Sequence, residues 1–396
     1  MKTTLWKLKN TFKNFDWGSL DGIPKYFHID NPEHKPMAEM WMGIHPGGVS
    51  TAINAQGVEE PLDQLINRYP NKILGAKTYQ QFKSLPFLFK ILSAKEPLSI
   101  QVHPELYKAK AGFAKENQLG IPMNSPNRNY KDPNHKPELI YAITPFLAMN
   151  GFRPIAEILA LFNQLSIPII EQHILTLAAN PSELGLKRFF HSLLTLEGAI
   201  KQQAISALLT SIKSLPEPPF NYIPPISQKY PSDCGVFAPL ILNIIELLPG
   251  QAMFLNAQTP HAYLRGTGLE IMANSDNVLR AGLTNKHIDI EELFNNTSFT
   301  SIPSTQLLTQ PRQQENKTLF PVSIDDFAFE IIHSQQQRLV QSISSAQIIL
   351  CVEGEIEINT ESDRCKLKVG ESVFIACCAK RFTYQGSGVF ARAFNH

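Results

Sequence analysis

The sequence predicts a mainly β protein with a helical insert, in which two related β-barrels accompany an all-α domain. Three observations support this. Short apolar runs broken by Gly, Pro and Asn fill residues 1–151 and return after residue 222. Residues 152–221 carry apolar side chains at helical spacing instead. A motif near the middle of the chain is echoed near its end, so we expect one discontinuous barrel from 1–151 and 222–302 and a second from 303–396.

The first β region contains clear strand candidates. Apolar runs at residues 38–43, 86–92 and 139–143 are short and bounded by turn residues, which is typical of strands. Two stretches, around 61–69 and 105–117, are more helical. A chain of 396 residues is long for a single core, so division into two or three domains is expected.

The insert shows helix signals in series. Residues 154–162 begin with a proline, which is favoured in the first turn, and the spacing continues over 182–190 and 201–209. A proline-dense connector at 216–225 is too stiff to continue a helix. Residues 303–321, rich in Gln, Thr and Pro, are expected to link the two barrels.

The echo joins a turn and strand at residues 248–255 to a similar stretch at 368–375. Aligned on their glycines, both copies have a polar residue, a small residue and an apolar triplet. Six residues beyond each strand the first copy has His261 and the second has Arg381. The repeat therefore indicates two related barrels, of which only the first could hold a metal at that position.

Composition limits the possible partners and location. A net charge of +1, from 36 basic and 35 acidic residues, leaves no electrostatic footprint for nucleic acid. The chain has no run approaching the roughly 20 apolar residues that span a bilayer, and its N-terminus lacks the apolar core of a secretion signal. Five cysteines, an odd number without CxxC spacing, are expected to be reduced thiols. We therefore expect a cytoplasmic protein without nucleic-acid or membrane partners.

Residues 97–105 alternate with period two, as in a strand. One face carries Leu98, Ile100 and Val102, and the other carries Ser99, Gln101 and His103. A lone histidine beside a glutamine is more often a hydrogen-bonded structural pair than a metal site. Here, however, Lys90 lies upstream and Lys136 and Glu138 lie downstream. These neighbours favour the interpretation that the polar face of the strand forms the wall of a polar cavity.

Glu138 and His261 complete a candidate metal set. Lys136 and Glu138 share a strand face, and in isolation a surface salt bridge is the simpler interpretation. Together with Gln101 and His103, however, the set offers one carboxylate, two imidazoles and one carboxamide. This donor set suits Zn²⁺ with an open position, while Fe²⁺ or Mn²⁺ on two histidines and a carboxylate is the competing interpretation. One carboxylate on a divalent ion leaves net positive charge, which suits an anionic oxygen.

Residues 268–286 combine Gly and Asn with four ionisable groups, soon after His261 in the chain. The ionisable residues are Glu270, Asp276, Arg280 and Lys286. A surface loop with turn residues is the simplest interpretation, but loops that carry chemistry have the same composition.

These residues together resemble a known family. The stretches 14–18, 38–46, 85–90, 97–104, 134–138, 260–264 and 270–284 are similar, in order and spacing, to the motifs of type I mannose-6-phosphate isomerases (phosphomannose isomerases). These are zinc enzymes of the cupin fold, and the resemblance covers the chain essentially end to end. It implies that both barrels are cupin-type jelly rolls. It also implies interconversion of mannose 6-phosphate and fructose 6-phosphate through an enediolate, in carbohydrate metabolism or in GDP-mannose biosynthesis.

The resemblance also implies a set of site residues. One Zn²⁺ per chain is expected on Gln101, His103, Glu138 and His261. The catalytic residues are expected to be Arg280, Lys136, Glu270 and Lys90, with Arg280 ranked first, Lys136 and Glu270 next, and Lys90 after them. The substrate-binding residues are expected to be Ser99, Trp17, Asp276 and Lys286. Arg280 matches the family's essential arginine, and negative charge on the enediolate is what a metal and an arginine would stabilise.

Individual roles stay open at this stage. The general base is Glu270, Lys90 or Lys136, and Asp276 is a candidate for ring opening. The phosphate is assigned to Ser99 and Lys136, with Lys90 or Lys286 as alternatives. The only partner expected is a small phosphorylated hexose, and a monomer is expected, with a weak homodimer as the alternative.

Two other functions compete with the isomerase. A metal-dependent cupin oxygenase would need a redox metal and open coordination positions. A non-enzymatic sugar-binding or regulatory protein could share the scaffold, although the intact ligand set and Arg280 weigh against it.

Overall fold

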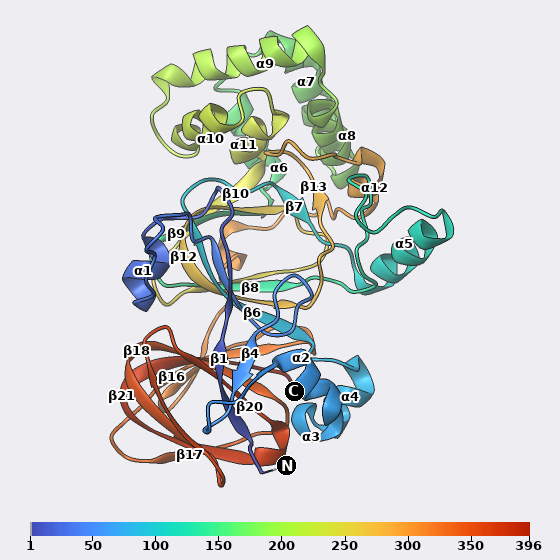
Figure 1. The fold of residues 1–396 in the computed structure, drawn as a ribbon. Coiled ribbons are helices and arrows are strands. Elements are labelled where there is room, and N and C mark those ends of the chain that lie inside the picture. Colours follow the sequence, from blue (N-terminus) through green and yellow to red (C-terminus); the bar gives the residue numbers. More distant parts are fainter. Residues whose placement is uncertain (1) are drawn as a thin grey trace.

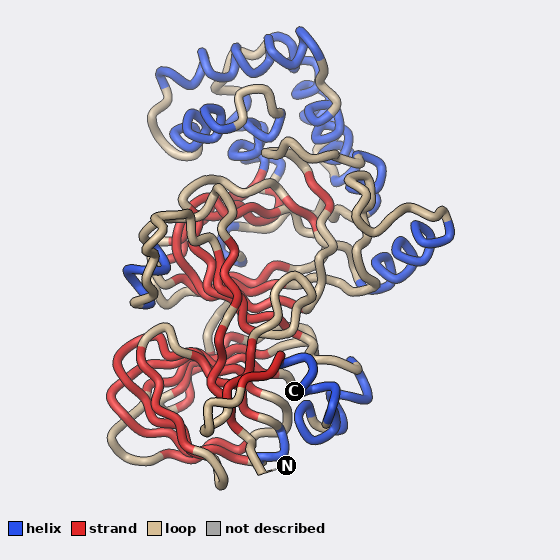
Figure 2. Tube along the Cα trace, in the orientation of Figure 1, coloured by secondary structure: helices blue, strands red, loops and turns tan. Residues whose placement is uncertain are grey.

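The protein has three tiers (Figure 1). The computed structural model describes residues 2–396. A helical layer lies at one end, a first β region lies in the middle, and a second β region lies at the other end beside both termini (Figure 1). Figure 2 shows the same division, with the helices of the end layer separated from the two groups of strands. Among the described residues, no helix combines the length and apolar character needed to cross a membrane.

The middle tier is a 10-stranded sheet with the order β10-β9-β12-β6-β3-β2, to which β7, β8, β11 and β13 also pair. Its strands are β2 (Thr11–Lys13), β3 (Glu39–Met42), β6 (Phe87–Ala94), β7 (Gln101–Val102), β8 (Glu138–Ala142), β9 (Phe146–Phe152), β10 (Leu242–Leu247), β11 (Ala252–Leu255), β12 (His261–Ala273) and β13 (Leu279–Arg280). The long strand β12 pairs with β6, β7, β8 and β9, so it organises the whole tier.

The lower tier is an 11-stranded sheet with the order β14-β15-β16-β21-β18-β20-β1-β4-β5 and with β17 and β19 added. Its strands are β1 (Leu5–Lys9), β4 (Thr51–Ile53), β5 (Glu59–Pro61), β14 (Arg312–Gln314), β15 (Lys317–Phe320), β16 (Ala328–His333), β17 (Leu339–Ser342), β18 (Gln347–Asn359), β19 (Arg364–Lys368), β20 (Ser372–Ile375) and β21 (Arg381–Phe394). All pairings between these strands are antiparallel.

The first strand pairs with the end of the chain rather than with its sequence neighbours. In β1, Leu5 lies opposite Ile375 of β20, and Lys7 also lies opposite Ile53 of β4. Leu5 and Trp6 are both buried although they point to opposite faces, as expected for an interior strand. The start of the 1–151 segment therefore lies in the sheet of the C-terminal region, which is a difference from the division expected from the sequence.

Helices cluster in the end layer, and a few flank the β tiers. The layer contains α6 (Ile155–Phe162), α7 (Glu171–Ala179), α8 (Glu183–Leu194), α9 (Gly198–Ser211), α10 (Ile223–Lys229) and α11 (Ala238–Ile241), with the short helices η1 (Pro168–Ile170), η2 (Ile212–Ser214), η3 (Phe220–Tyr222) and η4 (Cys234–Phe237). The others are α1 (Gly22–Phe27), α2 (Leu62–Arg68), α3 (Pro70–Leu74), α4 (Ala76–Phe82), α5 (Leu106–Gln118), α12 (Ile290–Asn295), η5 (Ser304–Gln306) and η6 (Cys377–Ala379).

The helical layer extends to Ile241, beyond the end expected at residue 221. Its proline-dense connector does not end the layer, because Pro224 and Pro225 lie in the first turn of α10. A proline is tolerated there, since the first-turn N–H groups have no partner within the helix. Further along the layer, α8 begins after Ser182, whose hydroxyl accepts the N–H of Gly185 at 3.1 Å.

One apolar core joins the helical layer to the middle sheet. Phe162, Phe189 and Phe237 from the helical layer belong to the same buried cluster as Ile100 and Val102 beside and within β7. Both of these aliphatic side chains are fully buried. The helices therefore hold the apolar side of the 97–105 segment.

The two β tiers repeat one local design. Gly250 and Gly370 both adopt positive φ, 91° and 83°, in the turns before β11 and β20. The long strands β12 and β21 begin at His261 and Arg381, as the sequence echo predicts. In each strand the fifth residue after the first is a glycine with similar φ, Gly266 at 134° and Gly386 at 133°. Backbone at such φ favours glycine, so the repeat extends beyond the motif seen in the sequence.

Neither sheet closes on itself among the described residues. The end strands β14 and β5 of the lower sheet do not pair with each other, and neither do β10 and β2 of the middle sheet. The architecture is therefore mostly β with a helical layer, built from two extensive bent sheets.

We predict that Trp6→Ala lowers the free energy of unfolding by about 3–5 kcal/mol, the cost of removing a buried aromatic side chain. Trp6 is 3% exposed and lies 6.2 Å, between ring centroids, from Phe374. Denaturant unfolding measures the effect, with Tyr107→Ala as the control because Tyr107 is 65% exposed. Equal stability of the two variants would contradict the placement of β1 inside the lower sheet.

Candidate active site and metal centre

Three neighbouring strands place the central side chains in one row. In the sheet, Gln101 of β7 lies opposite His261 of β12 on one side and opposite Arg280 of β13 on the other. Side chains directly opposite across neighbouring strands share a face and lie close together. The pairing therefore brings residues distant in the sequence to one side of the sheet.

The strand β7 is shorter than the predicted 97–105 stretch, in which Pro97 and Pro104 have no N–H to donate. The backbone of the segment is still held, since the Leu98 N–H donates to the Tyr263 carbonyl at 2.9 Å and the Ile100 N–H to the Gly282 carbonyl at 3.0 Å. The alternation predicted from the sequence is therefore kept beyond the two residues of the strand itself.

His103, Glu138 and His261 form a buried cluster suited to a metal ion. One potential ligand atom from each residue lies within 4.8 Å of the others. Nε2 of His103 lies 3.4 Å from Oε1 of Glu138, and Nε2 of His261 lies 3.5 Å from Oε2 of the same carboxylate. Two imidazoles and a carboxylate therefore meet at one point, as predicted.

The outer nitrogens of both imidazoles are held by the backbone. Nδ1 of His103 lies 2.7 Å from the Asn277 carbonyl oxygen, and Nδ1 of His261 lies 2.9 Å from that of Thr259. A carbonyl can only accept, so each Nδ1 carries a proton, and each Nε2 is the nitrogen that faces Glu138. Nε2 of His103 is buried and makes no hydrogen bond to the described residues. Such backbone support is the usual arrangement around metal-binding histidines, so these residues fit a metal ion.

The protonation state of His103 also suits a metal. Burial, followed by the nearby charge of Lys136, lowers the pKa of His103 to about 4. The imidazole is therefore neutral near pH 7, which is the form that binds metals. Burial raises the pKa of Glu138, but Lys136 and His103 outweigh it and hold this pKa well below its ordinary value.

Gln101 and Ser99 line the same pocket as the cluster. The pocket is lined by Glu39, Lys90, Leu92, Leu98, Ser99, Gln101, Lys136, Glu138, His261, Ala262, Tyr263 and Glu270. The Gln101 side chain donates from Nε2 to the Ser99 hydroxyl at 3.4 Å. The role of Gln101 as a fourth ligand stays a prediction.

Lys90 lies at the base of this pocket in a network of buried charges. Its ammonium group forms ion pairs with Glu270 and, at 3.3 Å, with Glu39. Burial by itself lowers the pKa of Lys90, but the charges of Glu270, Glu39 and Glu138 outweigh it and raise this pKa above its ordinary value. Lys90 is therefore held as a cation, which argues against the general-base role considered for it.

Glu270 is anchored on both oxygens. Tyr263 donates its hydroxyl to Oε1 at 2.8 Å, and Lys90 pairs with Oε2. Burial is the largest influence and raises the pKa of Glu270, although Lys90 opposes it. Burial, reinforced by the charge of Glu270, also raises the pKa of Tyr263 well above its ordinary value.

Glu39, Trp41 and Tyr263 belong to the site but were not singled out from the sequence. Trp41 donates Nε1–H to Glu39 Oε2 at 2.7 Å, and its ring lies 5.9 Å from the Lys90 ammonium group. Tyr263 follows His261 by two residues, so the period-two rule for strands would have found it. Glu39 and Trp41 alternate in the same way on β3.

Basic side chains meet near the row of β7 and β13. The Lys136 ammonium group lies 2.8 Å from Glu138 Oε1. Burial lowers the pKa of Arg280. The charge of Arg280, followed by burial, lowers the pKa of Lys286, which shows that these two cations lie within each other's field.

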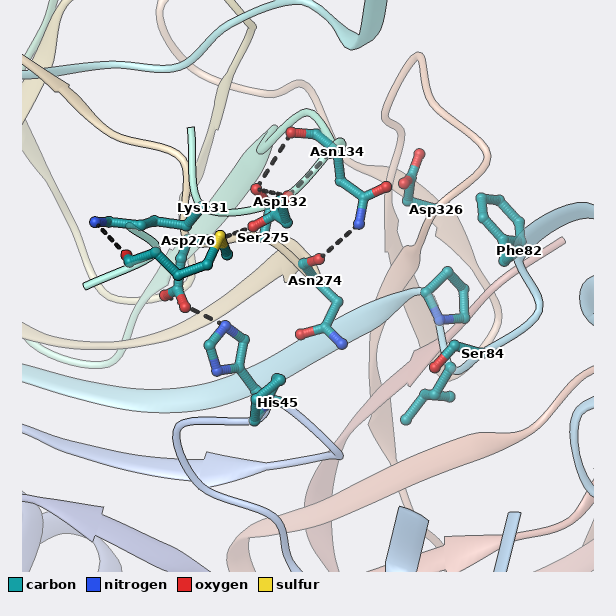
Figure 3. A pocket seen from close by; sticks show the side chains of 14 residues that line it. His45, Phe82, Ser84, Lys131, Asp132, Asn134, Asn274, Ser275, Asp276 and Asp326 are labelled. Carbon is teal, nitrogen blue, oxygen red and sulfur yellow. Dashed lines mark hydrogen bonds and ion pairs between the residues drawn. The ribbon is translucent and has the colours of Figure 1, made fainter. Parts of the chain in front are cut away.

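Asp276 and Trp17 lie outside the metal pocket. Asp276 Oδ1 lies 3.3 Å from His45 Nε2, at the edge of a separate cavity of about 640 Å³ (Figure 3). Burial raises the pKa of Asp276, but the hydrogen bond from His45 outweighs it and lowers this pKa. Trp17 is half-buried and stacks on Phe15 with ring centroids 5.6 Å apart. The substrate-binding roles expected of Asp276 and Trp17 stay predictions.

A mostly β architecture with two histidines and one carboxylate around a common point, surrounded by lysines and an arginine, defines a metal-dependent enzyme that acts on a polar, anionic substrate. The comparisons with known proteins identify the family within this class.

A family model for the catalytic domain of type I phosphomannose isomerases matches residues 5–155, and a model for the cupin domain of mannose-6-phosphate isomerases matches residues 316–395. The mannose-6-phosphate isomerase of Escherichia coli K12 is 46% identical over 391 residues, covering 98% of this chain and 99% of the relative. The human enzyme is 34% identical over 353 residues, covering 83% and 80%. The chain therefore belongs to the type I mannose-6-phosphate isomerase family and has a cupin-type fold.

Solved structures agree with this assignment. The mannose-6-phosphate isomerase of Salmonella typhimurium, solved bound to its substrate fructose 6-phosphate and a zinc atom, superposes with a TM-score of 0.94. It is 44% identical, and the match covers 99% of this chain and 100% of that chain. A zinc-bound holo structure of mannose 6-phosphate isomerase matches with the same TM-score and coverage.

We predict that Lys90→Met destabilises the protein by about 3–5 kcal/mol near neutral pH, because Glu270 and Glu39 lose a buried cation. Without it, the folded pKa of Glu270, which burial already raises, rises further above the unfolded value. Proton uptake by this carboxyl group then stabilises the folded variant at low pH. That stabilisation is lost as the pH rises through the folded pKa of the group. Unfolding midpoints at pH 5 and pH 8 measure this, with the exposed Lys95→Met as the control. If the stability that Lys90→Met loses relative to the unchanged protein does not grow from pH 5 to pH 8, the proposed charge network is contradicted.

Proposed function

We propose that this chain interconverts D-mannose 6-phosphate and D-fructose 6-phosphate through an enediolate stabilised by Zn²⁺ and Arg280. The observation that carries the proposal is the meeting of His103, Glu138 and His261 at one point, with both Nε2 atoms directed at the same carboxylate. The family membership supplies the reaction, since its relatives are mannose-6-phosphate isomerases.

The proposed metal is zinc, held by His103, Glu138 and His261 with Gln101 as the fourth ligand. These nitrogen and oxygen donors suit zinc, and family structures contain it. When bound, zinc supplies Lewis-acid stabilisation of negative charge on substrate oxygens without changing oxidation state. Glu138 is the only carboxylate among these four ligands, so the site keeps net positive charge towards substrate.

The isomerisation moves one hydrogen from carbon 2 to carbon 1 and one from the oxygen on carbon 2 to the oxygen on carbon 1. Negative charge develops on the carbonyl oxygen of carbon 1 as the proton leaves carbon 2, and reaches the oxygen on carbon 2 as its hydroxyl proton is transferred. We assign the stabilisation of this charge to Arg280, because the pairing of Arg280 with Gln101 across neighbouring strands places it in the row of the metal cluster.

We assign proton transfer to Lys136. Both carboxylate oxygens of Glu270 are already engaged by Tyr263 and Lys90, and Lys90 is engaged by two carboxylates. Lys136 lines the same pocket and pairs with one carboxylate only, that of Glu138, which the metal would share. In this assignment Glu270 and Lys90 balance charge and orient their neighbours.

The phosphate group is assigned to the basic side of the site. Lys286 lies within the field of Arg280 and forms no ion pair with a carboxylate in residues 2–396. Ser99 lines the pocket beside Gln101 and can donate its hydroxyl. We assign ring opening to Asp276, which is exposed at the adjacent cavity. We place Trp17 at the rim of the substrate site.

At the level of the whole chain, we propose a catalytic cupin barrel from residues 1–151 and 222–302, a helical insert from 152–221 and a non-catalytic barrel from 303–396. Two exchanges accompany this division: β1, β4 and β5 cross into the last barrel, and α10 and α11 of the 222–302 segment lie in the helical layer. The repeated glycine geometry of β12 and β21 supports two related barrels. We propose a monomer, with a weak homodimer as the alternative. The five free cysteines support a cytoplasmic location.

We predict that purified protein contains one zinc per chain and forms fructose 6-phosphate from mannose 6-phosphate. A chelator should remove activity, and added Zn²⁺ should restore it. A coupled assay measures the product, and elemental analysis measures the metal. Iron or copper in place of zinc would point to an oxygenase, and full turnover by metal-free protein would contradict the proposal.

We predict that Arg280→Ala lowers turnover by roughly a hundred- to a thousandfold, the usual effect of removing one donor to transition-state charge. Zinc content should stay unchanged, because Arg280 is not a ligand. Steady-state kinetics with metal analysis measures both, and Arg265→Ala on the exposed side of β12 is the matched control. Unchanged turnover in Arg280→Ala would mean that another group stabilises the enediolate.

A further inference from the structure

Asn277 lies near the metal cluster, and both polar atoms of its side chain are hydrogen-bonded. It lies between β12 and β13 and is fully buried. Its Oδ1 accepts the backbone N–H groups of Lys131 at 2.7 Å and Asp132 at 3.3 Å. Its Nδ2 donates to the backbone carbonyls of Asp132 at 2.7 Å and Asn134 at 2.8 Å.

This pattern requires a carboxamide in one orientation. Backbone N–H groups can only donate and carbonyl groups can only accept, so the amide of Asn277 cannot be flipped. An aspartate would lose both donors and set a charged oxygen against the carbonyls of Asp132 and Asn134. Leaving such buried groups unpaired is costly.

The backbone of Asn277 is in turn bound to the cluster. Its carbonyl oxygen accepts the proton on Nδ1 of His103 at 2.7 Å. This bond fixes the tautomer of His103 and directs Nε2 towards Glu138. The side chain of Asn277 thus fixes the very carbonyl that orients the imidazole.

The same residue also joins the segments that carry other site groups. The side chain of Asn277 hydrogen-bonds to the segment 131–134, which leads directly to Lys136 and Glu138. Asp276 is its neighbour in the chain, and Arg280 follows three residues later (the 131–134 loop and Asp276 are seen in Figure 3).

We propose that Asn277 is a positioning residue that holds His103, and the loop leading to Glu138, in the arrangement that binds the metal. This inference rests on the zinc site of the proposed function. This positioning role differs from a contribution to overall stability, because loss of the role would weaken metal binding in a protein that is still folded. Substitution of groups that orient metal ligands typically weakens metal binding by roughly 10- to 100-fold.

The test compares Asn277→Asp with Asn274→Asp in the full chain. The two variants make the same chemical change three residues apart in one loop. Asn274 is a matched control because its Oδ1 is also buried but has no hydrogen-bond partner among the described residues, so Asn274→Asp adds a similar buried charge without breaking a bond made by that oxygen. For each protein, chelator competition measures the zinc dissociation constant at a temperature where the metal-free form is folded, and thermal unfolding is measured with and without zinc.

We expect Asn277→Asp to weaken zinc binding by roughly 10- to 100-fold relative to Asn274→Asp, and to show a smaller rise in melting temperature on adding zinc. Zinc affinity within threefold of the control, with a lowered melting temperature of the metal-free protein, would show that Asn277 is merely structural. If Asn277→Asp does not fold, the uncharged Asn277→Ser decides by the same two measurements.

His261→Ala separates this inference from the proposed function. If His261→Ala loses zinc while Asn277→Asp keeps it, the zinc site stands and the role of Asn277 is wrong. If His261→Ala binds zinc as the unchanged protein does, the metal site itself is misassigned.

Discussion

The position of the 97–105 segment is the constraint on which the site depends. Its apolar side chains Ile100 and Val102 are locked in the core shared with the helical layer, and its backbone is bound by β12 and β13 on either side. Because side chains alternate along a strand, fixing one face fixes the other. A slip of one residue would turn Gln101 and His103 into the helical core, so packing energy in one tier specifies the position of polar groups in the pocket.

The pocket behind that segment is electrostatically organised before any ligand enters. Lys90 and Lys136 alternate with Glu39, Glu138 and Glu270, and every one of these side chains has a partner of opposite charge or a hydrogen bond. Buried charges of this kind are stable only as a complete set, because each one left alone would lose its hydration without compensation. The set therefore keeps its shape, and a reaction within it does not have to reorganise the surrounding dipoles.

The sequence predicted what depends on local periodicity and missed what depends on distant pairing. The alternation at 97–105 placed Ser99, Gln101 and His103 on one side, because a strand sets side-chain direction residue by residue. Nothing in the first ten residues indicates that β1 pairs with β20, since that choice is made by a segment more than 360 residues away. Trp17 lies within a family motif but stacks on Phe15, because a motif shows which residues occur together and not where each side chain points.

The crossing of β1 into the lower sheet bears on how the protein is made. A ribosome releases Leu5–Lys9 long before Ser372–Ile375, yet β1 lies beside β20 near the centre of one sheet. In the nascent chain, the edge of β1 that pairs with β20 therefore stays unpaired until nearly the whole polypeptide has emerged. A chain truncated after the middle tier would leave that edge of β1 open to intermolecular pairing, so β20 protects against aggregation as well as forming part of the fold.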